Sequence, residues 1–197
     1  MILRYNRRVL SSSVMVMLTS LSFQLPAQSD EGILLQLQDN LDEPRGICID
    51  IRGYRDSIDL HVPVQAHTCK PDPDRREDGM FIVEQFEGQS GTTRFRNPTY
   101  DVCLDVLSAE ERGSIFVRKC SGAESQQFTI RAPGEIRPVP NPGTCITVSP
   151  SPSYPAVFAG TEIKPGVTFV ARAMSLATCK YVNKIYKTWA LPASSSS

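Results

Sequence analysis

The chain has 197 residues, which is enough for one domain of ordinary size or two very small ones, and too few for a large enzyme with a separate cofactor domain. Its composition is 41% hydrophobic and 21% charged, which excludes wholesale disorder. Basic and acidic residues balance at 21 each, so no net charge draws the chain to nucleic acid or anionic lipid. Only two histidines are present, which nearly excludes sites that need several histidine ligands.

The first residues have the order of an export signal. Three arginines precede an apolar run from Val9 to Leu25, and Ala27 supplies a small residue at a cleavage point. The run is too short and too rich in hydroxyl residues for a membrane span, which needs ~20 apolar residues. We therefore expect a signal peptide over residues 1–27 and a secreted or periplasmic mature chain. That chain is slightly acidic, because the removed segment carries arginines and no acid.

All six cysteines follow the expected cleavage point, at positions 48, 69, 103, 120, 145 and 179. An even number of cysteines in an exported chain predicts a disulfide framework. No Cys-x-x-Cys pair occurs and the spacings match no zinc finger, so we assign no metal. The cysteines alone leave 15 pairings open.

Three stretches of the chain resemble one another. The segments GICIDI (46–51), DVCLDV (101–106) and GTCITV (143–148) each place a cysteine inside an apolar alternation. Each is followed by a second cysteine and then by an aromatic residue, which is Phe81, Phe128 or Trp189. A period of about 40 to 55 residues is typical of repeat architectures. If each repeat folds as a unit, the bridges are Cys48–Cys69, Cys103–Cys120 and Cys145–Cys179.

Short strands are the predicted secondary structure. Apolar residues alternate with period two, and Gly or Pro interrupts the chain every 8 to 12 residues, a pattern that favours a closed all-β fold. We expect one domain over residues 28–192, with repeats at about 33–90, 91–134 and 135–192, and a disordered tail at 193–197. Residues 171–177 are the one segment where we expect a turn of helix.

These motifs resemble those of the ricin B-type (R-type) β-trefoil lectins, which repeat a Gly-x-Cys-x-Asp-Val start, a second cysteine and a Gln-x-Trp. The second copy matches closely, with Phe128 in place of the tryptophan, and the third has Thr147 where the aspartate belongs. The resemblance implies a β-trefoil of twelve strands with approximate threefold symmetry. It also implies that Phe81, Phe128 and Trp189 pack in the shared core.

The resemblance implies where sugar would bind in each repeat. An Asp two residues after the first cysteine takes sugar hydroxyls, and an aromatic two residues before the second cysteine stacks on the ring. A Gln two residues before that aromatic and an Asn just before the Gln-x-Trp complete the site. The first copy offers Asp50, Gln65, His67 and Asp78, and we expect it to be the better site.

The other two copies depart further from the pattern. The second copy offers Asp105, Arg118 and Ser125, with Phe116 at the Gln position. The third copy has Thr147, Ser175, Ala177 and Tyr186 at the four positions and lacks both carboxylate and ring, so we expect no sugar site there. Residues 70–79 are rich in acids, but their spacing does not fit a calcium loop and we expect a solvated loop.

Two functions remain open at this point. The first is a secreted, non-catalytic module that binds galactose-type glycans or glycoproteins without a cofactor. The second is a trefoil that has lost sugar binding and docks on a protein, either as the cell-binding subunit of a toxin or as an inhibitor, so that its partner is a separate toxin or enzyme chain. A secreted hydrolase is disfavoured, because no nucleophile–base pair or carboxylate pair stands out.

Overall fold

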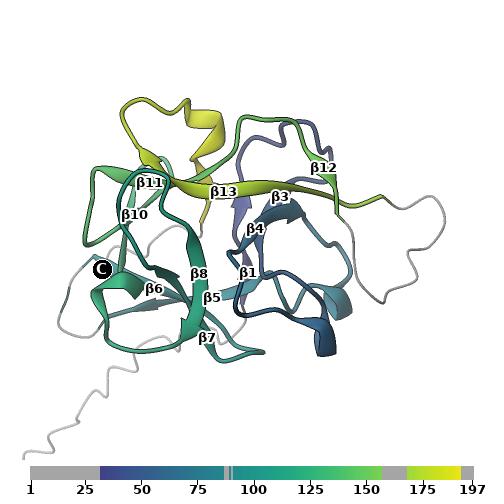
Figure 1. The fold of residues 1–197 in the computed structure, drawn as a ribbon, viewed down its shortest axis with the longest axis horizontal. Coiled ribbons are helices and arrows are strands. Elements are labelled where there is room, and N and C mark those ends of the chain that lie inside the picture. The colour runs from purple at the N-terminus through teal and green to yellow at the C-terminus, as the bar shows by residue number, and fades with distance from the viewer. Residues whose placement is uncertain (1–31, 87–88, 90, 157–167, 192–197) are drawn as a thin grey trace, which may run out of the picture.

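The computed structural model describes residues 32–86, 89, 91–156 and 168–191. These residues form short strands and four 3-10 turns, and the strands fall into three consecutive units. Figure 1 shows how the strands are arranged. The predicted all-β fold with three repeats is therefore confirmed. The expected signal peptide (1–27) and tail (193–197) lie outside the described residues. Within the described ranges no helix is long and apolar enough to span a membrane.

The first repeat opens with a strand that divides at Leu35 into two short segments, β1 and β2. β1 pairs with β5, whereas β2 pairs with β3 and with the last described strand, β14 (Trp189–Ala190). β3 and β4 form an antiparallel hairpin. The elements of this repeat are β1 (Ile33–Leu34), β2 (Gln36–Leu37), β3 (Ile47–Asp50), η1 (Arg55–Ser57), β4 (Gln65–Thr68), η2 (Pro73–Arg75) and β5 (Met80–Gln85).

The second repeat has four strands, and its first strand, β6, is shared among three neighbours. β6 pairs with β5, β7 and β9, and β8 stands at the end of the sheet order β1-β5-β6-β7-β8. The elements are β6 (Thr92–Asn97), β7 (Val102–Val106), β8 (Ile115–Lys119), η3 (Glu124–Gln126) and β9 (Phe128–Arg131).

The third repeat contains the longest strand, β13, with nine residues. β13 pairs with β11 at one end and with β4 of the first repeat at the other, so it crosses the top of the molecule in Figure 1. The elements are β10 (Glu135–Pro138), β11 (Thr144–Val148), β12 (Tyr154–Pro155), β13 (Val170–Thr178), η4 (Lys184–Tyr186) and β14 (Trp189–Ala190).

Two expectations from the sequence need correction. The described residues hold fourteen strands instead of twelve, because the opening strand divides into β1 and β2 and because β12 is added against β13. The turn of helix expected at residues 171–177 is wrong, since that segment is the middle of β13. Its backbone hydrogen-bonds to β11 and β4, and this tertiary pairing outweighs the local preference of its alanines for helix.

The core lies where the three repeats meet. The aromatic that follows the second cysteine in each repeat is fully buried, and these residues are Phe81, Phe128 and Trp189. The indole Nε1 of Trp189 donates to the carbonyl of Ile146 at 3.2 Å, which satisfies its one polar group. The ring of Phe95 packs against that of Phe128 with centroids 5.6 Å apart.

Each repeat contains its own disulfide, so the predicted intra-repeat pairing is confirmed. The bridges are Cys48–Cys69, Cys103–Cys120 and Cys145–Cys179. In the chain-entropy account each bridge contributes ~3 kcal/mol by restricting the unfolded chain. The first cysteine of each pair lies on β3, β7 or β11, and every residue of these three strands is buried.

Candidate functional site

Three equivalent positions lie on β3, β7 and β11, two residues after the first cysteine of each repeat. They hold Asp50, Asp105 and Thr147. Side chains alternate along a strand, and the residues next to each position belong to the core, so these three side chains point to the opposite face. Each position pairs directly with a residue of a neighbouring antiparallel strand, which is β4 for Asp50, β8 for Asp105 and β13 for Thr147.

In the first repeat an internal cation occupies the predicted site. The ammonium of Lys70 lies 2.8 Å from Oδ2 of Asp50 and also hydrogen-bonds to Oδ2 of Asp78. The amide of Gln65 donates to Oδ1 of Asp50 at 3.3 Å. All four side chains are buried, and Asp78 is completely inaccessible. Three of the predicted residues do come together, but their carboxylates are satisfied by Lys70.

Burial and charge set the protonation of this cluster. Burial and the neighbouring carboxylate of Asp50 raise the pKa of Asp78 to about 7, and the ammonium of Lys70 opposes that rise. Burial by itself would lower the pKa of Lys70, but the two carboxylates outweigh it and the pKa is raised. Lys70 therefore stays charged, and the two carboxylates share one cation.

The ring predicted to stack on a sugar is covered. His67 is 0% exposed, and the ring of Phe169 stacks on it with centroids 5.5 Å apart. Nδ1 of His67 lies 2.9 Å from the carbonyl of Thr68, and burial lowers the pKa of the imidazole. The face of His67 that was predicted to contact a ligand is therefore covered by the ring of Phe169 in this structure.

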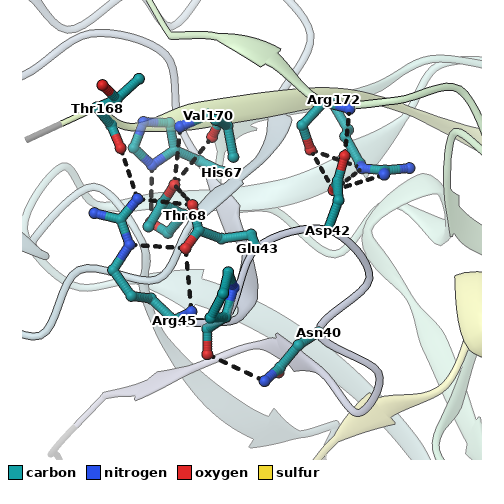
Figure 2. A network of polar contacts seen from close by, with 11 residues as sticks. Asn40, Asp42, Glu43, Arg45, His67, Thr68, Thr168, Val170 and Arg172 are labelled. Atoms are coloured by element: carbon teal, nitrogen blue, oxygen red, sulfur yellow. Dashed lines mark hydrogen bonds and ion pairs between the residues drawn. The ribbon is translucent and has the colours of Figure 1, made fainter.

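A polar network holds the segment around Phe169 against the first repeat (Figure 2). Arg45 pairs with Glu43 at 2.7 Å and donates to the carbonyl of Thr168 at 2.6 Å. The hydroxyl of Thr68 donates to Glu43 at 3.0 Å and accepts the backbone N–H of Val170 at 2.9 Å. Arg45 also lies over the ring of Phe169, 5.4 Å from its centroid.

A second ion pair holds the body of β13 in place. Nη2 of the buried Arg172 lies 2.7 Å from Oδ1 of Asp42, and Ser153 hydrogen-bonds to both side chains. The backbone N–H of Ser153 and the guanidinium of Arg172 hold the pKa of Asp42 well below its usual range. Figure 2 shows this pair beside the first network. The two networks together fix the third repeat across the first.

In the second repeat the carboxylate of Asp105 is buried as well, but no internal cation pairs with it among the described residues. The amide Nε2 of Gln126 donates to Oδ2 of Asp105 at 2.9 Å and to the carbonyl of Lys119 at 3.0 Å. Its Oε1 accepts the backbone N–H of Ser121 at 2.7 Å, so the amide is held in one orientation. The other oxygen of Asp105, Oδ1, has no hydrogen-bond partner within the described part of the chain.

The remaining predicted residues of the second repeat differ in their burial and in how they are placed relative to Asp105. Phe116 pairs directly with Asp105 across β7 and β8 and is half-buried, and Arg118 lies two residues further along the same face and is exposed. Ser125, in η3, is also half-buried, and it makes no hydrogen bond to Asp105 among the described residues. The second repeat therefore offers an oriented carboxylate, an aromatic face and an accessible cation.

The described residues of the third repeat hold no comparable group. The hydroxyl of Thr147 donates to the carbonyl of Ser175 at 2.8 Å and is used up within the sheet. Lys187 stands where Gln126 stands in the second repeat, and its ammonium pairs with Glu135 at 2.7 Å. The one cluster of potential metal ligands in the described ranges joins Glu135 to Cys145 and Cys179, whose sulfurs form a disulfide and offer no thiolate.

Three residues at these sites were missed by reasoning from the sequence. Gln126 is the first residue of the Gln-x-Phe motif, which could have identified it as the partner of Asp105. Lys70 follows the second cysteine of the first repeat, in the segment expected to be a solvated loop. That expectation is wrong at both ends of the loop, because Lys70 and Asp78 are buried. Phe169 lies 102 residues from His67, and no local pattern links the two.

Comparisons with known proteins agree with the fold. The model of the ricin-type beta-trefoil lectin domain matches residues 91–161, which confirms the predicted resemblance to that family. A search of curated proteins found no match. The structure is similar to a chain of the cytolethal distending toxin from Actinobacillus actinomycetemcomitans, with a TM-score of 0.56 and 16% identity, over 85% of this chain and 93% of that one.

Two further solved structures are similar. A chain of the Haemophilus ducreyi cytolethal distending toxin aligns with a TM-score of 0.55 and 15% identity, over 86% of this chain and 87% of that one. The designed threefold-symmetric protein ThreeFoil aligns with a TM-score of 0.52 and 10% identity, over 75% of this chain and 92% of that one. At these identities the likeness concerns the fold.

Proposed function

We propose that this β-trefoil chain, whose residues 91–161 match the ricin-type beta-trefoil lectin domain, is a secreted, non-catalytic module that binds galactose-type glycans through its second repeat. The mature protein would begin after residue 27, in an oxidising compartment where its three disulfides persist. The glycan is its partner, and no cofactor is needed.

The arrangement of Asp105 and Gln126 is the observation that carries this proposal. A sugar is held by an acceptor for its hydroxyls and by a flat apolar face for its C–H groups. Gln126 orients Asp105 and leaves Oδ1 without a partner among the described residues, and Phe116 lies directly across the strand pair. The buried carboxylate is stabilised when a sugar hydroxyl donates to Oδ1, because an unsatisfied buried acceptor costs ~1–3 kcal/mol.

The first repeat is not the working site in this proposal. Its carboxylates already accept hydrogen bonds from Lys70 and Gln65, and a sugar would have to displace a buried ammonium. Breaking such a pair costs ~3–5 kcal/mol, more than one sugar hydroxyl returns. This reverses the order of the two sites expected from the sequence, where Asp50, Gln65 and His67 match the family pattern more fully.

A glycan array probed with the purified, oxidised protein tests the proposal. Asp105→Asn preserves the shape of the side chain and removes its charge, so we expect binding to weaken by at least ~10-fold, the loss of about 1.5 kcal/mol from one charge-assisted hydrogen bond. Asp101→Asn is the matched control, because Asp101 lies in the same repeat and its side chain is 76% exposed. Binding that survives Asp105→Asn would contradict the proposal.

The second candidate function, a docking subunit of a toxin, has its own support. Two of the three repeats lack a usable carboxylate, and two of the structures that resemble the fold are chains of cytolethal distending toxins. A trefoil in that role would contact a separate toxin chain. A tight complex with one defined protein partner, together with no array signal, would favour docking, whereas an array signal lost in Asp105→Asn would favour glycan binding.

A further inference from the structure

A pocket lies between the first and second repeats, along the edge strand β8. Its volume is about 370 Å³. One wall is formed by Leu60 and His61 from the loop before β4, and the other by residues 116–119 of β8. Because β8 ends its sheet order, side chains from both of its faces reach the same opening. Phe116 and Arg118, two positions of the second-repeat site, therefore also line this pocket.

The charged side chains that line the pocket are basic. Arg118 and Lys119 are both exposed, and neither has an ion-pair partner within the ranges that the structure describes. His61 adds an exposed imidazole, and the carboxylate of Asp59 close to it accepts the backbone N–H of His61 at 2.9 Å. None of the described residues that line the pocket is acidic.

On some other surfaces of the molecule, by contrast, arginines are paired with acidic side chains. Arg94 and Arg96 share Glu84, and Arg137 pairs with Glu135. The cations of those surfaces are thus neutralised by their own strand neighbours. At β8 the positive charge stays available, next to the aromatic ring of Phe116 and one strand away from Asp105.

We propose that the glycan bound at the second repeat is acidic, and that its carboxylate or sulfate group sits in this pocket against Arg118 and Lys119. The planar guanidinium of Arg118 offers two parallel N–H donors that match the oxygens of such a group. Lys119 supplies a second positive charge, Phe116 contacts the C–H face of a ring, and Asp105 accepts a hydroxyl of the same or the adjacent sugar. The inference rests on the proposed function, since it uses the same site.

Paired glycans provide the test. Binding is measured by titration calorimetry for a neutral galactose-terminated oligosaccharide and for the same oligosaccharide carrying a sialic acid, a uronic acid or a sulfate. We expect at least one acidic form to bind ~10-fold or more tightly than the neutral parent, with that advantage reduced as salt is raised. The three acidic arms distinguish a carboxylate from a sulfate.

Arg118→Gln separates this inference from the proposed function. It should remove the advantage of the acidic glycan, so that the acidic and neutral forms bind the variant equally, whereas Asp105→Asn should weaken the binding of both. Arg131→Gln is the matched control, because Arg131 is an exposed arginine of the same repeat at the end of β9. Equal binding of neutral and acidic forms, with no effect of Arg118→Gln, would overturn the inference and leave the proposed function standing. Absence of binding to every glycan would overturn both.

Discussion

The ammonium of Lys70 lies 2.8 Å from Oδ2 of Asp50, where a sugar hydroxyl would have to bind. Asp78 completes the cluster from the other side, and all three side chains are withdrawn from solvent. A position that favours ligand binding in the sequence is thus a structural ion cluster in the fold. At the same position in the second repeat, Asp105 is also buried, but a neutral amide holds one carboxylate oxygen and the other has no hydrogen-bond partner among the described residues.

Lys70→Met should destabilise the protein strongly. It leaves two buried carboxylates without a cation, and removing one partner of a buried ion pair costs ~3–5 kcal/mol. Urea denaturation at neutral pH measures the change in the free energy of unfolding. The triple variant Lys70→Met, Asp50→Asn, Asp78→Asn removes the stranded charges and should recover part of the loss. A single variant that unfolds at the wild-type midpoint would show that the cluster contributes nothing.

The cluster should also make stability depend on pH. The pKa of Asp78 is raised from 3.8 to about 7 in the folded state, so the native protein binds one more proton than the unfolded chain between these values. The free energy of unfolding contributed by Asp78 is therefore highest at low pH and declines as pH rises from about 4 to about 7. Asp78→Asn should remove that decline in denaturation curves recorded at several pH values.

The carboxylate of Glu43 changes stability with pH in the opposite direction and serves as an internal comparison. Hydrogen bonds from Arg45 lower the pKa of Glu43, and this carboxylate stabilises the fold at pH values above its unfolded pKa of 4.5. That contribution is lost as pH falls below 4.5 and persists in Asp78→Asn. A difference between the wild type and Asp78→Asn that is constant from pH 4 to pH 8 would contradict the raised pKa of Asp78.

Trp189→Ala should cost ~3–5 kcal/mol, because it empties a fully buried position in the core shared by the three repeats. Trp189→Phe should cost less, since it retains most of the apolar volume. Trp189 is the single tryptophan of the chain, so the native emission should be that of an indole shielded from water and should shift to the red on unfolding. A loss below about 1 kcal/mol for Trp189→Ala would conflict with a core position.

Phe169→Ala should uncover His67 without creating a sugar site. The pKa of His67 is lowered by burial, so removing the stacked ring should raise it toward 6.5. An NMR titration of the imidazole measures this change, and Phe169→Leu, which keeps an apolar cover, should change the pKa less. Glycan affinity should be the same as in the wild type. A gain in glycan affinity would mean that the first repeat can work once it is uncovered.

The sequence sufficed for features that recur in all three repeats. The order of cysteine, strand and aromatic predicts the disulfides and the buried positions of Phe128 and Trp189, because each copy supports the others. The sequence did not predict that the long segment between Cys145 and Cys179 places β13 and Phe169 against the first repeat. Contacts of this kind join residues far apart in the chain and have no counterpart in the other copies.

The ranking of the two sites failed for a similar reason. Asp50, Gln65 and His67 fit the family pattern by residue type, and the fold does place Asp50 beside Gln65. Lys70 determines whether Asp50 can accept a hydrogen bond from a ligand, and the family pattern has no position for this lysine. Gln126 belongs to the motif, but its function depends on reaching Asp105, 21 residues earlier in the chain.

Chemical-shift mapping on the isotopically labelled, oxidised protein tests the central claim most directly. During titration with a galactose-terminated glycan, we expect the largest changes at the side-chain amide of Gln126 and the backbone amides of Asp105 and Phe116. The side-chain amide of Gln65 should stay unchanged, and Asp105→Asn should abolish the response. Changes centred on Gln65 and Asp50 would place binding in the first repeat and contradict the account.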